Sequence, residues 1–134
     1  QAGDFAQAYV VAHEVGHHIQ NLLGISSQVQ RAQAQANRTQ ANQLSVRLEL
    51  QADCYAGVWA ADANRRGLLD SPNEIEEAVR ATEGLSDNYI QLATKGQIDK
   101  EKWTHGSGEQ RRTWFLKGFN SADPTSCDTF AGLL

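Results

Sequence analysis

The chain is organised around residues 13–17, His13-Glu14-Val15-Gly16-His17, which lie inside an apolar, helix-patterned run from Phe5 to Leu23. Side chains four residues apart on a helix stand one above the other, so His13 and His17 point the same way. Two imidazoles placed like this can both bind one zinc ion at about 2.0–2.1 Å. Glu14 lies about 100° further round the helix, where it can hold a water on the metal without being a ligand. The spacing therefore predicts a zinc site.

Length and composition limit the possible partners. The 134 residues suffice for one domain with a hydrophobic core, and we expect residues 1–134 to form a single domain. The net charge of −4 and the lack of a Lys/Arg cluster argue against nucleic acid as a partner. No apolar run approaches the length of a membrane span. Because the chain begins at Gln1 and contains no Met, we expect it to be the N-terminally truncated part of a longer protein.

Helical patterning continues along the rest of the chain. The stretch from Gln28 to Gln43 is rich in Ala and Gln and predicts a helix with a break near Asn37–Gln40. Leu44–Arg66 has a broad apolar face and predicts a long helix. Further helices are predicted at Pro72–Glu83, Asp87–Lys95 and Ser107–Asn120. Ser71 precedes the first of them and is followed by Glu74, and Ser107 begins the last and is followed by Gln110, so both have the spacing of a capping box. No segment alternates with period two, so we predict an all-α fold.

The third metal ligand has to come from another part of the chain, because catalytic zinc usually has three protein ligands and a water. One zinc-peptidase pattern places a Gly and a third His shortly after the second His, but Gln20 and Leu23 stand at those positions. Another pattern uses a Glu from a later helix followed by an Asp four residues on. Glu49 and Asp53 have this spacing and share a helical face. We predict that Glu49 is the third ligand and that Asp53 accepts an N–H from a ligand His. The main alternative is that Asp53 is the ligand.

Taken together, these motifs resemble those of the bacterial neutral zinc metallopeptidases, a gluzincin-like group. The resemblance rests on residues 13–17 and on residues 49–57, Glu-Leu-Gln-Ala-Asp-Cys-Tyr-Ala-Gly, and extends to residues 105–111 and 127–130. It implies a zinc peptidase whose zincin-like helical catalytic core occupies residues 1–134, with upstream β elements missing. It also implies an N-terminal membrane anchor outside these residues and an extracytoplasmic domain, in the periplasm or at the cell surface. The expected partner is a peptide or protein substrate.

The predicted residues support metal-assisted hydrolysis of a peptide bond. With His13, His17 and Glu49 as ligands, Zn²⁺ keeps one position for water and lowers the pKa of that water towards 7. Glu14 would act as general base and pass the proton to the leaving amine. The alternative is a metal-stabilised binding or scaffold domain without turnover. A purely structural site has no use for Glu14, so its presence favours the enzyme.

Two further polar residues, His105 and Arg111, are candidates for the same site. His105 stands just before a capped helix and next to a glycine that allows close approach. We predict that His105 donates a hydrogen bond to the oxyanion; a His without a role at a helix entry is the alternative. Arg111 could orient His105, bind a carboxylate or be solvated. Tyr55 and Tyr89 could also donate a hydrogen bond.

The two cysteines, Cys54 and Cys127, are too few for a disulfide framework. On the predicted helix Cys54 points about 140° away from Glu49, so it is not expected to bind the same metal. If the domain is extracytoplasmic, as the resemblance implies, a Cys54–Cys127 disulfide would hold the polar C-terminal tail against the back of the ligand helix. Two free thiols are the alternative.

Overall fold

The computed structural model describes residues 4–69 and 73–131, and all regular secondary structure within those ranges is helical. This confirms the predicted all-α fold for the described part of the chain. None of the described helices combines the length and the apolar character needed to cross a membrane. The elements are, in chain order, α1 (Asp4–Leu22), α2 (Ile25–Ala34), α3 (Arg38–Arg65), α4 (Asn73–Gly84), α5 (Asp87–Lys95), η1 (Lys100–Lys102), α6 (Gly108–Ser121) and η2 (Pro124–Ser126).

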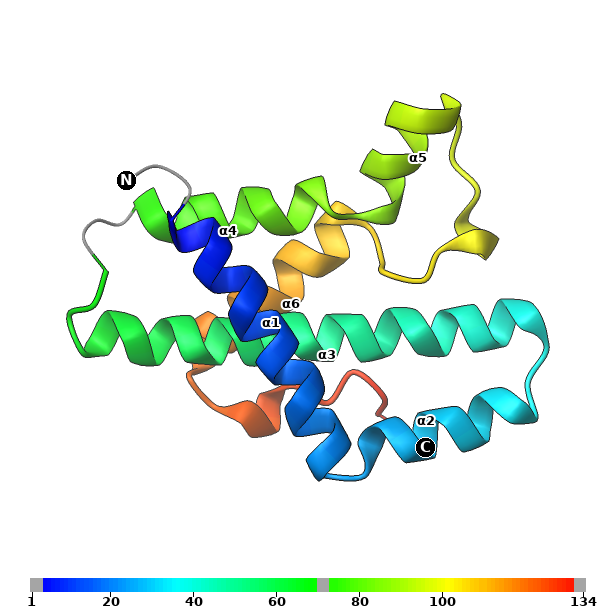
Figure 1. Cartoon of the computed structure of the whole chain (residues 1–134), viewed down its shortest axis with the longest axis horizontal. Helices are drawn as coiled ribbons and strands as arrows, with labels where there is room; N and C mark the ends of the chain where they lie inside the picture. Colours follow the sequence, from blue (N-terminus) through cyan, green and yellow to red (C-terminus); the bar gives the residue numbers. More distant parts are fainter. Residues whose placement is uncertain (1–3, 70–72, 132–134) are drawn as a thin grey trace.

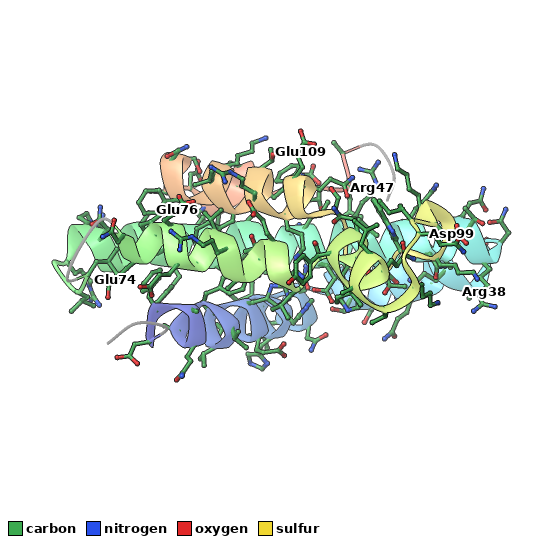
Figure 2. All side chains as sticks on the ribbon, turned by 90° about the horizontal axis from the view of Figure 1, so that it is seen from above. Arg38, Arg47, Glu74, Glu76, Asp99 and Glu109 are labelled. Atoms are coloured by element: carbon green, nitrogen blue, oxygen red, sulfur yellow. A yellow bond between two sulfur atoms is a disulfide. The ribbon has the colours of Figure 1, made fainter. Side chains whose placement is uncertain are left out.

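Helix α3 is the longest element; α1, α2 and α6 pack against it, whereas α4 packs on α1 and α6 (Figure 1). Helix α1 crosses α3 at an angle, and α2 runs back beside the first half of α3. Seen from above, α1 and α6 lie on opposite sides of α3 (Figure 2). Charged side chains labelled in that view, such as Arg38 and Asp99, lie at the periphery. Residues of α3 can therefore contact α1 on one side and α6 on the other.

Glycines allow the helices to approach closely on both sides of α3. A Cβ atom added at Gly118 of α6 would lie 2.0 Å from the carbonyl oxygen of Cys54, and one added at Gly57 would lie 2.0 Å from that of Phe115. On the other side, a Cβ at Gly16 of α1 would lie 3.1 Å from the carbonyl oxygen of Ala52. Side chains at these positions would push the helices apart. The glycines thus bring the polar side chains of α1, α3 and α6 within bonding distance.

The hydrophobic core lies between α1, α3, α4 and α6. Its largest buried side chains include Phe5 and Tyr9 from α1, Val79 from α4 and Phe115 from α6. Tyr9 and Phe115 meet edge to face with their ring centroids 5.8 Å apart. This aromatic contact fixes α1 relative to α6 next to the polar cluster described below.

Local sequence accounts for most helix boundaries. Asn37 caps α3 with reciprocal hydrogen bonds to Gln40, so the predicted break near these residues is confirmed. The helix predicted over Leu44–Arg66 begins earlier, at Arg38, because residues 38–43, the end of the stretch predicted as a broken helix, are continuous with it. The predicted start of the Pro72–Glu83 helix lies outside the described residues.

The C-terminal tail is held along α3. Cys54 and Cys127 form the expected disulfide, with Cα atoms 5.6 Å apart, and both are fully buried. Beyond it, the Arg47 guanidinium donates to the Thr129 carbonyl at 2.7 Å, and the Thr129 hydroxyl donates to the Arg47 carbonyl at 2.6 Å. Phe130 is buried as well. The polar tail is therefore part of the packed structure.

Candidate metal centre

The facing sides of α1 and α3 bring together two imidazoles and a carboxylate. Glu49 Oε2 lies 2.8 Å from His13 Nε2 and 3.2 Å from His17 Nε2. Ligand atoms of a tetrahedral zinc site, each about 2.05 Å from the ion, lie about 3.3 Å apart. The two observed separations need to lengthen only by about 0.5 Å and about 0.1 Å to match this geometry. The donor types and the two separations from Glu49 therefore fit zinc.

Glu14 lies at the rim of the same centre. Single ligand atoms of His13, Glu14 and His17 all lie within 4.8 Å of one another. Glu14 is exposed, whereas Glu49 is half-buried and is hydrogen-bonded to both rings. Glu14, Glu49 and His105 also line a cleft of about 260 Å³. The centre thus offers one carboxylate against both imidazoles and a second one open to solvent.

Asp53 lies on the other side of the His13 ring. Its Oδ1 is 2.8 Å from His13 Nδ1, and it also accepts from the Tyr9 hydroxyl and from Arg111 Nη2, the latter at 3.1 Å. Its Oδ2 accepts from Arg111 Nε at 2.7 Å. The Asp53 side chain is completely buried. Asp53 therefore contacts the nitrogen that points away from Glu49, and both of its oxygens are occupied.

The electrostatics of this cluster keep Asp53 ionised. Burial raises the pKa of Asp53, but hydrogen bonds from His13 and Arg111 outweigh burial and lower it below 3.8. Burial also raises the pKa of Tyr9, and the neighbouring Asp53 charge raises it further, so the phenol stays protonated as a donor. For His13, burial lowers the pKa, but the hydrogen bonds to Asp53 and Glu49 raise it to about 9. A metal ion would compete with this proton at Nε2, so metal uptake is expected to release protons.

Two residues next to the imidazoles were not singled out from the sequence as part of the site. Tyr9 donates to Asp53, and Gln20 Oε1 lies 2.8 Å from His17 Nδ1. Tyr9 stands four residues before His13, and Gln20 stands three residues after His17. Helical periodicity places both on the ligand-bearing face. That spacing is the signal from which they could have been found.

His105 lies at the edge of the cleft, in the loop before α6. The backbone N–H groups of His105 and Gly106 donate to Asp87 Oδ2 at 2.6 Å and 2.8 Å. His105 Nδ1 lies 3.2 Å from Asp87 Oδ1, and this hydrogen bond raises the pKa of His105. Ser107 and Gln110 form the predicted capping box at the start of α6. The loop and the capped helix thus hold the exposed imidazole beside the metal centre.

Arg111 binds a carboxylate, which was one of the three alternatives for it. Its guanidinium makes two hydrogen bonds to Asp53 and a further one to the Leu85 carbonyl at 3.1 Å. Tyr55 lines an apolar groove between α1 and α3 instead of the cleft. Tyr89 is 60% exposed and does not line the cleft either. The structure therefore brings neither tyrosine to the cleft.

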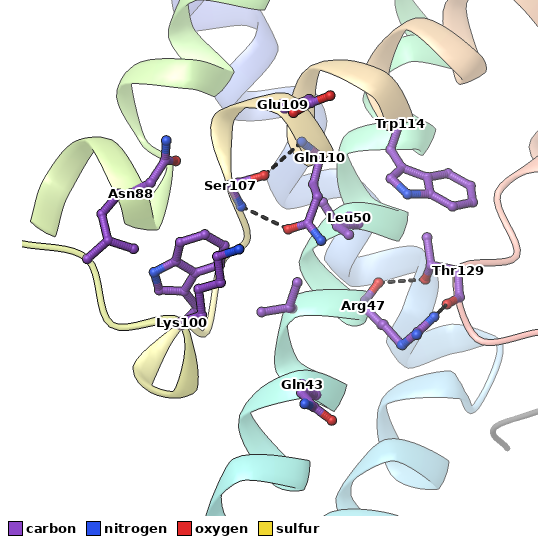
Figure 3. Close-up of a pocket in the computed structure, with 13 residues that line it drawn as sticks. Gln43, Arg47, Leu50, Asn88, Lys100, Ser107, Glu109, Gln110, Trp114 and Thr129 are labelled. Carbon is purple, nitrogen blue, oxygen red and sulfur yellow. Dashed lines mark hydrogen bonds between the residues drawn. The ribbon is translucent and has the colours of Figure 1, made fainter. Parts of the chain in front are cut away.

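A larger hollow of about 830 Å³ lies between α3, η1 and α6 (Figure 3). Its wall contains the Ser107–Gln110 capping pair and the Arg47–Thr129 contact, both visible in the figure. Trp114 lines the hollow on the α6 side. None of the residues predicted to act in catalysis or metal binding lines this hollow. It is thus distinct from the metal centre.

The fold and the centre define a helical H-E-x-x-H metal site of the zinc-peptidase type. Comparison with known proteins agrees with this class. Residues 1–130 match the family described as "Putative neutral zinc metallopeptidase", and the chain belongs to this family. No solved structure matches the chain significantly.

The similar proteins in curated collections are bacterial. The uncharacterized protein YpfJ of Escherichia coli K12 is 48% identical over 128 residues, which cover 96% of this chain and 44% of that protein. The uncharacterized protein Rv2575 of Mycobacterium tuberculosis H37Rv is 45% identical over 139 residues, which cover 96% of this chain and 45% of that protein. The chain therefore spans less than half the length of these relatives.

Proposed function

We propose that this protein is a zinc-dependent peptidase in which His13, His17 and Glu49 hold the metal. The observation that carries the proposal is the placement of Glu49 Oε2 at 2.8 Å and 3.2 Å from the two Nε2 atoms. Asp53 is less suited as a ligand, because it contacts Nδ1 of His13 and its oxygens already accept hydrogen bonds from three side chains. Its role is instead to orient His13 and to raise the basicity of that ring.

Zn²⁺ held by these residues would act as a Lewis acid towards the scissile carbonyl and would lower the pKa of a water molecule. Glu14 is the general base: its exposed carboxylate lines the cleft, takes a proton from the attacking water and delivers it to the leaving amine. His105, which lines the same cleft, donates a hydrogen bond to the oxyanion, and Asp87 holds its ring. Such a donor contributes about 10²–10³ in rate.

We further propose that the substrates are peptides or proteins and that the domain acts outside the bacterial cytoplasm. The Cys54–Cys127 disulfide supports an oxidising compartment. The net charge of −4 supports a partner other than nucleic acid. Attachment to a membrane would come from an N-terminal anchor outside these residues.

Metal analysis combined with a peptide hydrolysis assay tests the proposal. We expect one zinc per chain in the wild type and in Glu14→Gln, and loss of zinc in His13→Ala and Glu49→Ala. Hydrolysis should be absent in Glu14→Gln and unchanged in Glu76→Gln, a matched exposed acid on α4. The assay should include the full-length protein, because the chain spans less than half of its relatives.

Two results would contradict parts of the proposal. Stoichiometric zinc in Glu49→Ala would reject Glu49 as ligand and point to Asp53. Zinc binding without hydrolysis by the full-length wild type would reject the peptidase and support a metal-stabilised binding or scaffold domain.

A further inference from the structure

A chain of neutral hydrogen bonds runs from His17 to the C-terminal tail. His17 Nδ1 lies 2.8 Å from Gln20 Oε1, and Gln20 Nε2 donates to Gln51 Oε1 at 3.0 Å. Gln51 Nε2 donates in turn to the carbonyl oxygen of Cys127 at 2.9 Å. Gln20, Gln51 and Cys127 are 0%, 5% and 1% exposed. Water therefore has little access to this chain, and each amide depends on its protein partners.

The direction of every hydrogen bond in this network follows from its last acceptor, the Cys127 carbonyl oxygen. A backbone carbonyl can only accept, so the NH₂ group of Gln51 must face Cys127 and its oxygen must face Gln20. The NH₂ group of Gln20 then faces Gln51, and it also donates to the Leu48 carbonyl at 2.8 Å. The oxygen of Gln20 is left to face His17 Nδ1. That nitrogen must therefore carry a proton, so the neutral His17 ring keeps its lone pair on Nε2, the nitrogen that would bind the metal.

We propose that Gln20 and Gln51 are positioning residues that fix the tautomer and ring orientation of His17 as a metal ligand, with the Cys127 carbonyl as their outer anchor. The inference rests on the proposed zinc site and goes beyond it. The two imidazoles are held differently: the Asp53 carboxylate faces Nδ1 of His13, whereas a neutral amide faces Nδ1 of His17. The C-terminal tail, held by the disulfide, thereby contributes to a metal site built on α1 and α3.

Zinc affinity, measured by competition with a chelator, tests the proposal on the variants Gln20→Met, Gln51→Met and the double variant. Gln20→Met should weaken zinc binding by about 10–100-fold, as expected for loss of the partner of a ligand imidazole. Gln51→Met should weaken it by about 2–10-fold, the worth of one neutral hydrogen bond, because Gln20 keeps its bond to Leu48. The double variant should match Gln20→Met alone, because Gln51 acts through Gln20.

The matched control is Gln33→Met. Gln33 is half-buried, whereas Gln20 and Gln51 are buried, but it too donates to a backbone carbonyl and a second side chain, those of Ala41 and Ser45. It lies outside the hydrogen-bond network that reaches His17. Its zinc affinity should equal that of the wild type. In the zinc-loaded wild type, NMR of ¹⁵N-histidine-labelled protein should show a proton on Nδ1 of His17. This signal should weaken or disappear in Gln20→Met.

Folding is checked by circular dichroism and thermal unfolding in EDTA. If Gln20→Met does not fold, Gln51→Met and Gln51→Glu carry the test; the latter turns an oxygen towards the Cys127 carbonyl and should also weaken binding. Wild-type zinc affinity in the folded variants, or strictly additive effects of the two substitutions, would overturn the inference. A wild-type protein that binds no zinc would instead overturn the proposed metal site.

Discussion

Replacing Asp53 by Asn tests the carboxylate behind His13 at nearly constant side-chain size. Asp53 accepts from Tyr9, from His13 and twice from Arg111 in a fully buried position. An asparagine has one acceptor oxygen, so its NH₂ group must face at least one of these donors. If the oxygen keeps the place of Oδ1, the NH₂ group opposes Arg111 Nε. The guanidinium, 3% exposed, then loses its counter-charge.

The expected magnitudes follow from this geometry. Removing one partner of a buried ion pair costs about 3–5 kcal/mol of unfolding free energy. A domain of this length has roughly 7–20 kcal/mol at about 0.05–0.15 kcal/mol per residue, so the Asp53→Asn variant should still fold. Its zinc affinity should fall by about 10–100-fold, because His13 loses its charged acceptor. That loss corresponds to about 1.4–2.7 kcal/mol of binding free energy.

Two assays separate these effects. Urea unfolding in the presence of EDTA measures protein stability, and chelator competition measures zinc affinity. Asp62→Asn is the matched control on α3, because Asp62 contacts Arg65 and Arg66 at the surface. It should change stability by less than about 0.5 kcal/mol and leave zinc affinity unchanged. If a folded Asp53→Asn bound zinc as tightly as the wild type, Asp53 would have no role in orienting His13.

Three further predictions concern the packing and the rim of the cleft. In Gly118→Ala the new Cβ would lie 2.0 Å from the Cys54 carbonyl oxygen, so chemical denaturation should show a loss of about 3 kcal/mol from overpacking. Gly84→Ala, with nothing within 4 Å, should be neutral or stabilising; an equal loss in both would refute the packing argument. His105→Ala in the full-length protein should retain zinc and lower peptide hydrolysis by about 10²–10³-fold, and wild-type turnover would remove His105 from the mechanism. The Asp87 hydrogen bond raises the pKa of His105 above 6.5, so its contribution to stability is present below pH 6.5 and is lost as the pH rises through the raised pKa. NMR titration should show this pKa falling towards 6.5 in Asp87→Asn; an unchanged value would contradict the contact.

Much of the fold could be predicted because its signals are local. The positions of His13, Glu14 and His17 relative to one another depend only on helical periodicity, which the apolar pattern around them reveals. The break before α3 follows from the reciprocal capping of Asn37 and Gln40, which are only three residues apart in the sequence. The sequence does not show that residues 38–43 and the Leu44–Arg66 helix are one element, because residues 38–43 contain no large apolar residue to continue the apolar face. Periodicity detects helices that bury one face, and this stretch has few large apolar residues.

The sequence by itself determined that two imidazoles and a carboxylate share one helix, and that Glu49 and Asp53 share a face of another. Only the tertiary structure decided which acid faces Nε2 of the imidazoles and which lies behind the ring. These acids are four residues apart, about 6 Å along the helix axis, so their roles depend on how far α1 is shifted along α3. The choice of Asp53 as the partner of Arg111 likewise depends on the close approach of α6 at Gly118. A glycine at a helix crossing leaves no trace in hydrophobic periodicity, because its effect is the distance between two helices far apart in the chain.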